Sequence, residues 1–177
     1  MLEIKCLNEK LTNKKVDVHK VNNKGEWLNL KKKLMKIAIA SDHAGVDYKK
    51  RLIDVLKEEG NELLDLGPFN EDRVDYPDYG HALAHKVSTK EVDMGILFCG
   101  SGNGINMSAN KHKEIRSALC WKKEIAELAR LHNNANVLTM PARFISFEEV
   151  KEIASIFIET EFEGGRHEAR VNKISCS

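Results

Sequence analysis

The chain of 177 residues lacks several features that define whole classes of protein. It has no apolar run near the roughly 20 residues that a membrane-spanning helix needs, and its first residues lack the apolar core of a signal peptide. It has only four cysteines, and no two of them form a CxxC pair. Neither a disulfide framework nor a zinc site of that type is therefore predicted, and we expect a cytoplasmic protein with free thiols.

An excess of charge of one sign is also missing, because the formal net charge is +1. The distribution is nevertheless uneven: residues 1–34 hold nine lysines and four acidic residues, a net +5, which leaves −4 for residues 35–177. Since nucleic-acid binding needs a basic patch on the folded domain, it is not expected of residues 35–177. Residues 1–34 are predicted to be a lysine-rich, partly ordered extension. An RNA-binding arm, or an addition upstream of a start at Met35, is the alternative.

From Met35 onward, short apolar segments alternate with segments of helical periodicity. This alternation predicts a three-layer α/β sandwich, in which helices cover both faces of a five-stranded parallel sheet. Ligands of such sheets bind beyond the carboxyl ends of the strands. The predicted strands are 35–41, 62–67, 92–99, 115–121 and 135–140, and the predicted helices are about 46–60, 78–90, 122–133 and one that begins near Ser146.

The segment "GILFCGSGNGI" is the most informative of these junctions, because an apolar strand ends at Cys99 and glycines follow at 100, 102 and 104. Alternate glycines let several backbone N–H groups point at one anion. A tight turn that needs positive φ is the structural alternative. Three known motifs fail here: Ile105 replaces the lysine of a P-loop and the arginine of a cysteine phosphatase, and the pattern is not GxGxxG after a first strand.

A cysteine at the mouth of such a turn is a candidate base or nucleophile, since the N–H groups are expected to lower its pKa. A base next to an oxyanion hole is what proton abstraction beside a carbonyl requires. His43 and His132 are predicted at or near the same edge of the sheet. Three arginines are candidates for binding a phosphate by paired hydrogen bonds, namely Arg143, Arg166 and Arg170.

Five motifs, taken in order, resemble the type B ribose 5-phosphate isomerase family, which also contains the galactose 6-phosphate and allose 6-phosphate isomerases. The resemblance covers residues 35–177 and implies a Rossmann-like fold without metal or cofactor. It also implies a homodimer or a dimer of dimers, in which two subunits share each active site. The motifs are "SDHAG" (41–45), "DYPDY" (75–79), "GILFCGSGNGINMSANK" (95–111), "LHNNANVL" (131–138) and "EGGRHEARV" (163–171).

The resemblance implies reversible isomerisation of ribose 5-phosphate to ribulose 5-phosphate through a cis-enediolate, a step of the non-oxidative pentose phosphate pathway. Cys99 matches the residue that moves a proton between C2 and C1. His132 matches the residue that opens the furanose ring, and Asn133 beside it contacts the substrate. The residues that match the loop stabilising the enediolate are Gly100, Ser101, Gly102, Asn103 and Gly104.

The remaining site residues implied by the resemblance bind the substrate. Asp42 and His43 match a binding pair after the first strand, and Tyr76 matches a residue of the pocket. The residues that match the phosphate-binding arginines are Arg143, Arg166 and Arg170, and the last two are expected to reach a neighbouring subunit's site.

Two alternatives to this activity remain open. A six-carbon sugar phosphate could be the substrate, because pocket length and not the catalytic residues would distinguish it. A non-catalytic module that binds phosphosugars could use the same turn. Cys99 and His132 argue against the second alternative, because binding alone needs neither residue.

Overall fold

The computed structural model describes residues 15–21 and 27–175, and the chain divides into two compact units, residues 1–34 and 35–177. In the first unit, β1 (Lys15–Val21) pairs with β2 (Trp27–Lys33) as an antiparallel hairpin. This hairpin was not among the predicted elements, because lysines interrupt the apolar alternation of both strands. Each unit is described by itself below.

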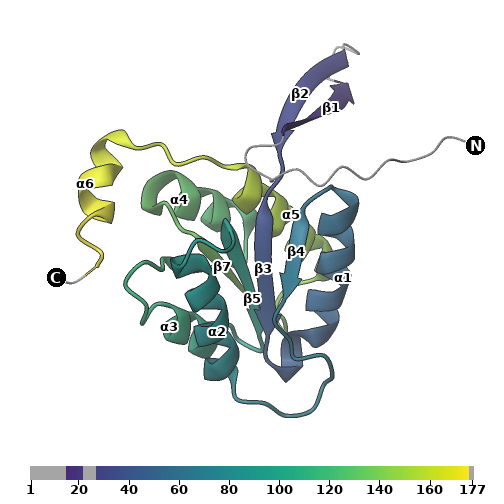
Figure 1. Ribbon diagram of the computed structural model, residues 1–177, viewed down its shortest axis with the longest axis vertical. Coiled ribbons are helices and arrows are strands. Elements are labelled where there is room, and N and C mark those ends of the chain that lie inside the picture. The colour runs from purple at the N-terminus through teal and green to yellow at the C-terminus, as the bar shows by residue number, and fades with distance from the viewer. Residues whose placement is uncertain (1–14, 22–26, 176–177) are drawn as a thin grey trace, which may run out of the picture. The chain divides into compact units, whose positions relative to one another are not determined.

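The second unit contains a five-stranded, all-parallel sheet in the order β4-β3-β5-β7-β6. The predicted α/β fold with a five-stranded parallel sheet is therefore confirmed. The strands point toward the lower part of Figure 1, where their carboxyl ends lie. Their bounds are β3 (Lys36–Ser41), β4 (Glu62–Asp65), β5 (Met94–Cys99), β6 (Ser117–Leu119) and β7 (Val137–Pro141).

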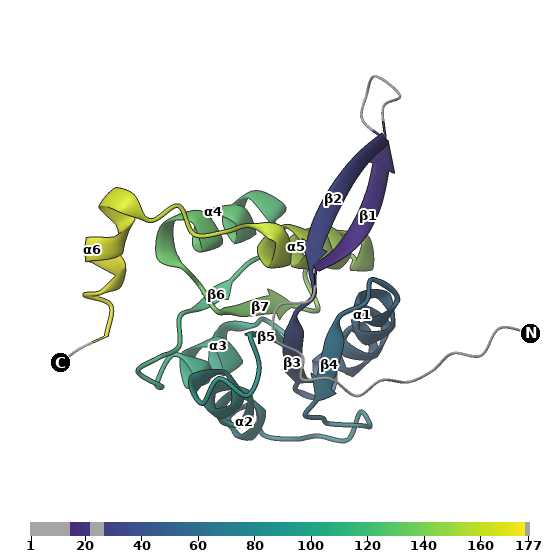
Figure 2. The same ribbon diagram turned by 45° about the horizontal axis from the view of Figure 1, so that its top comes forward.

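Helices form a layer on each side of this sheet, with α1, α4 and α5 on one face and α2 and α3 on the other (Figure 2). The predicted start of α5 is confirmed, because Glu149 N donates to Ser146 Oγ and Ser146 N donates to Glu149 Oε2 in a capping box. The elements are η1 (His43–Gly45), α1 (Val46–Glu58), α2 (Tyr76–Ser88), α3 (Asn103–Ala109), α4 (Lys123–Asn133), α5 (Phe147–Glu159), η2 (Gly165–His167) and α6 (Glu168–Val171).

The two faces of the sheet are packed differently. In β3, Ile37 and Ile39 belong to the core under α1, α4 and α5, whereas the alternate residues Ala38 and Ala40 face α2 and α3. Gly95 allows close packing on this second face, because a Cβ there would lie 2.3 Å from Leu83 Cδ2. Small residues thus let α2 lie close to the sheet.

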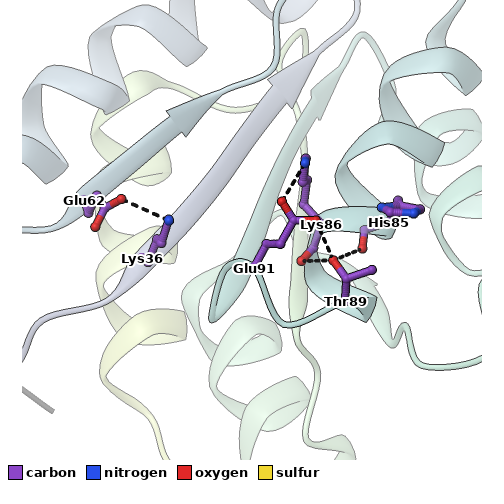
Figure 3. Close-up of polar contacts among 6 residues, drawn as sticks. All are labelled: Lys36, Glu62, His85, Lys86, Thr89 and Glu91. Atoms are coloured by element: carbon purple, nitrogen blue, oxygen red, sulfur yellow. Dashed lines mark hydrogen bonds and ion pairs between the residues drawn. The ribbon is translucent and has the colours of Figure 1, made fainter. Parts of the chain in front are cut away.

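The amino edge of the sheet carries exposed ion pairs (Figure 3). Lys36 Nζ lies 3.2 Å from Glu62 Oε1 at the starts of β3 and β4. Between α2 and β5, Glu91 accepts from Lys86 Nζ at 2.6 Å and from Thr89 Oγ1 at 2.9 Å, and these bonds lower the pKa of Glu91. No helix of the described residues is long and apolar enough to span a bilayer.

Candidate active site

The carboxyl ends of β3 and β5 lie side by side, since Ser41 pairs with Phe98 and Asp42 N donates to Phe98 O at 3.0 Å. The chain leaves β3 toward β4 on one side, and β5 lies on the other side. This junction is the topological switch point at which open α/β sheets bind ligands. The structure therefore brings "SDHAG" and "CGSGNG" together at the predicted edge.

Cys99 ends β5 and is 6% exposed. Burial raises the pKa of its thiol, and so do a hydrogen bond to the Asp42 carboxylate and the negative charge of that group. The backbone N–H groups of Gly102 and Ile105 lower the pKa of the thiol, as predicted for this turn, but they are outweighed. The prediction of a lowered pKa for Cys99 is therefore wrong, because burial and Asp42 have the larger effect.

Two glycines of the turn are required for different reasons. Gly102 has φ +77° at the start of α3, and a Cβ there would lie 2.4 Å from Leu119 Cδ1. At Gly104 a Cβ would lie 2.6 Å from the ring of Tyr76, which opens α2. Tyr76 thus lies directly against the turn. The side chain of Tyr76 is 41% exposed, so its ring is also available to a ligand.

Arg143 reaches the same turn from the end of β7. Its backbone N–H donates to Gly100 O at 3.2 Å, and a Cβ added at Gly100 would lie 3.3 Å from Arg143 Nε. Between these glycines, Ser101 and Asn103 are exposed, and Asn103 N lies 3.4 Å from Ser101 Oγ. A cationic side chain therefore lies over the residue that follows Cys99.

Asp42 and His43 complete this side of the site. Asp42 is 6% exposed, and its Oδ1 accepts from Ala44 N at 2.9 Å, which fixes the carboxylate as the cap of η1. His43 is half-buried, and its buried Nδ1 has no hydrogen-bond partner in the part of the chain described. A buried, unpaired ring nitrogen is costly and is well suited to bind a ligand.

We call these residues the carboxyl-edge group. They share one edge of the sheet within a single chain and combine a thiol, a carboxylate, a turn of backbone N–H groups and a guanidinium. Its members are Asp42, His43, Tyr76, Cys99, the turn 100–104 and Arg143.

His132 does not lie in this group within one chain. The prediction that His132 lies at or near the ligand edge is therefore wrong for a single chain. It lies in the last turn of α4, which returns the chain from β6 to the amino end of β7. The register pairs Cys99 with Pro141 and Gly95 with Val137, four steps of about 3.3 Å apart. His132 and Asn133 precede Val137, so they lie toward the opposite edge of the sheet.

The C-terminal arginines lie with His132 and not with Cys99. Arg130 Nε donates to Thr160 O at 3.0 Å, which ties the segment after α5 to α4. Arg166 and Arg170 follow on η2 and α6, which lie at the upper left of Figure 1, away from the carboxyl ends of the strands. The two arginines are i, i+4 neighbours as predicted, and Arg170 Nη1 donates to Arg166 O at 2.9 Å.

Two residues with no role in the sequence analysis lie against His132. The rings of His132 and His167 stack with centroids 4.2 Å apart and planes 7° apart, and Glu163 Oε2 lies 3.8 Å from His132 Nε2. Glu163 and His167 both belong to the motif "EGGRHEAR", in which a role is predicted from the sequence for the arginines alone. We call the set formed by His132, Asn133, Glu163, Arg166, His167 and Arg170 the tail group.

His132, Glu163 and His167 offer ligand atoms within 4.8 Å of one another. The geometry nevertheless differs from that of a metal site. Nitrogen lone pairs lie in the planes of their rings, and the planes of these two stacked rings are only 7° from parallel with centroids 4.2 Å apart, so no single point beside the rings lies in both planes. These atoms do not converge on one centre as tetrahedral ligands must.

A pocket of about 470 Å³ lies beside the edge strand β6. It touches the tail group at Asn133 and contains no member of the carboxyl-edge group. It is lined by Asn110, Arg116, Ser117, Ala118, Leu119, Ile125, Leu128, Ala129, Asn133, Ala135 and Ile174.

Residues 37–174 match the family model described as Ribose/Galactose Isomerase. The chain belongs to this family. The match spans the parallel sheet with both groups of site residues, and the resemblance noted in the sequence is confirmed. Residues 1–36, which include the hairpin β1–β2, lie outside the matched range.

Relatives of the Ribose/Galactose Isomerase family agree with this assignment. A putative sugar phosphate isomerase of Bacillus subtilis is 46% identical over 142 residues, which cover 80% of this chain and 95% of the relative. Ribose-5-phosphate isomerase B of Escherichia coli is 40% identical over 143 residues, or 81% of this chain and 96% of the relative.

Solved structures of this family share the fold. A ribose 5-phosphate isomerase of Thermotoga maritima superposes with a TM-score of 0.79 at 45% identity, covering 80% of this chain and 97% of that one. Ribose-5-phosphate isomerase B of Mycoplasma genitalium, with bound ribulose-5-phosphate, superposes with a TM-score of 0.75 at 43% identity. The match covers 78% of this chain and 93% of that one. Members of this family are expected to catalyse aldose–ketose isomerisation.

Proposed function

We propose that this protein interconverts ribose 5-phosphate and ribulose 5-phosphate through a cis-enediolate. The observation that carries the proposal is the position of Cys99, which is buried between the Asp42 carboxylate and the N–H groups of Gly102 and Ile105. A base beside a preformed anion-binding turn is what this proton transfer requires. Relatives named as ribose-5-phosphate isomerases, one of them with ribulose-5-phosphate bound, support the choice of substrate.

In the chemical step, the Cys99 thiolate removes the proton from C2 of the open-chain aldose. The electrons of the C2–H bond form a C1–C2 double bond, and the C1 carbonyl oxygen becomes an oxyanion that faces the turn 100–104. The same proton then returns to C1, the proton of the C2 hydroxyl passes to the oxyanion at C1, and C2 becomes the carbonyl carbon. Because the raised pKa keeps Cys99 a thiol before the reaction, the thiol must first be deprotonated. Asp42, which accepts its hydrogen bond, is the group toward which that proton moves.

The active site is shared between two copies of residues 35–177. In one chain, His132 and Asn133 lie toward the edge of the sheet opposite Cys99, and Arg166 and Arg170 lie with them. An isologous interface would place the tail group of each copy at the carboxyl-edge group of the other and would create two equivalent sites. Either a homodimer or a dimer of dimers meets this condition.

Turnover assays test the function directly. Ribose 5-phosphate, allose 6-phosphate, galactose 6-phosphate and unphosphorylated ribose are compared, each with and without a chelator. We expect turnover of ribose 5-phosphate above that of the six-carbon phosphates, no turnover of ribose, and no effect of the chelator. Preference for a six-carbon phosphate would reassign the substrate, and failure to convert any of the phosphates would reject the isomerase.

A further inference from the structure

The segment "EGGRH" folds back onto the end of α4. Glu163 N donates to Leu131 O at 3.1 Å, which satisfies a carbonyl in the last turn of α4. Gly164 and Gly165 then adopt φ +70° and +55°, and His167 N donates to Gly164 O at 3.0 Å. No atom lies within 4 Å of a Cβ added at either glycine. Glycine is therefore required at these two positions because the chain reverses with positive φ, and not because a side chain would clash with its surroundings.

This reversal places His132 between a ring and a carboxylate. His167 is 8% exposed and stacks on His132, whose own side chain is 36% exposed. Glu163 Oε2 lies 3.8 Å from His132 Nε2 and 3.7 Å from His167 Nε2. A half-exposed imidazole is thus held by a nearly buried one, with one negative charge beside the nitrogens of both.

We propose that Glu163 and His167 are positioning residues for His132, an inference that rests on the proposed function. In ring opening, the bond from C1 to the ring oxygen breaks, the hydroxyl on C1 loses its proton to become the carbonyl, and the ring oxygen gains a proton. An imidazole that relays these protons passes through its cationic form. Glu163 stabilises that cation, and His167 fixes the plane of the ring.

The charges around the pair disfavour a proton on His167. Burial lowers the pKa of His167, and the charges of His132, Arg166 and Arg170 lower it further, whereas Glu163 opposes them. Arg166 Nε also donates to His167 Nε2 at 3.3 Å, so this nitrogen of His167 carries no proton.

Two assays separate ring opening from proton transfer. Consumption of ribose 5-phosphate, which is mostly a furanose, requires both steps. Ribulose 5-phosphate cannot close a furanose, because its O5 carries the phosphate. Exchange of its C1 proton with solvent D₂O, followed by NMR, therefore requires Cys99 but no ring opening.

We expect Glu163→Gln to lower kcat for ribose 5-phosphate by about tenfold, since a positioning group contributes less than the acid–base residue itself. Exchange at C1 should stay within about twofold of wild type, which also shows that the variant is folded and assembled. Glu161→Gln makes the same change of charge on an exposed residue of the same segment and should leave both rates unchanged.

A second pair of variants tests the stacked ring. His167→Phe keeps a flat ring against His132 and should retain most of the ribose 5-phosphate activity, whereas His167→Ala should lose it selectively. If Glu163→Gln and His167→Ala slowed both assays equally, or slowed neither, the positioning role would be rejected. A wild-type protein active in neither assay would instead reject the proposed function, and the inference with it.

Discussion

The carboxyl-edge group and the tail group are built in opposite ways. Cys99 and Asp42 are each 6% exposed and are fixed by backbone hydrogen bonds at the ends of adjacent strands. His132 and the two tail arginines lie on helix ends and short turns, where side chains stack and pair with one another. The proposed function thus assigns the proton transfer to the rigid centre of the domain, and the ring opening and two of the three phosphate-binding arginines to its periphery.

This difference has a physical reason. An oxyanion that exists only during the reaction is best stabilised by dipoles that do not reorganise, and the backbone at the end of a buried strand provides them. A substrate must also enter and leave, so the groups that hold its outer parts need access to solvent. The proposed placement of those groups on a second copy would bring one rigid edge and one adaptable segment together at each site.

The largest effect on activity should come from a substitution in the carboxyl-edge group. Cys99→Ala removes the base, and kcat for ribose 5-phosphate should fall by about 10³-fold, within the range for general acid–base groups. Binding of ribulose 5-phosphate, measured by calorimetry, should persist because the arginines remain. Cys120→Ala is the control, since Cys120 is fully buried in the core beside α4. Near-normal kcat in Cys99→Ala would require another base.

Mixing two inactive variants tests whether the two groups meet across copies. Cys99→Ala and His132→Ala are each expected to be nearly inactive on ribose 5-phosphate. When they are dissociated and reassembled together, random pairing gives heterodimers with one intact site, and about a quarter of wild-type activity should return. Heterodimers that form but remain inactive would show that Cys99 and His132 of the same chain serve one site.

The stability of the domain should depend on a buried ion pair between α1 and the end of β4. Lys49 has a fully buried side chain and pairs with Asp65, whose Oδ1 also accepts from Gly67 N at 2.9 Å. Asp65→Asn should cost about 3–5 kcal/mol in the free energy of unfolding, because it leaves a buried cation unpaired.

The exposed pair at the amino edge provides the control for this substitution. Lys36 and Glu62 have side chains that are 44% and 50% exposed (Figure 3). Glu62→Gln should therefore cost about 0–1 kcal/mol. Urea denaturation measures both variants, and equal losses would contradict the distinction between the two pairs.

The smallest effect concerns the reactivity of Cys99 itself. Asp42 raises the pKa of the thiol, so Asp42→Asn should lower it and increase the thiolate fraction at neutral pH. The pH profile of alkylation by iodoacetamide should accordingly move to lower pH. Burial raises the pKa of Cys120 to about 12, so this residue should stay unmodified and serve as an internal control. An unchanged midpoint would show that burial alone sets the pKa of Cys99.

The sequence determined the elements of the parallel sheet and one group of the site. Alternating strand and helix patterns predicted the five strands, and Ser146 with Glu149 predicted the start of α5. Because the ends of parallel strands meet at one edge, Cys99, its glycines and "SDHAG" could be placed together. These features depend on local periodicity and on topology, which a sequence displays directly.

Only the tertiary structure decided how these residues act on one another. It showed that burial and Asp42 outweigh the N–H groups at Cys99, that Gly104 makes room for Tyr76, and that His132 lies away from Cys99. It also brought Glu163 and His167 to His132. Each of these depends on segments far apart in sequence that pack at a particular distance, and periodicity carries no information about that distance.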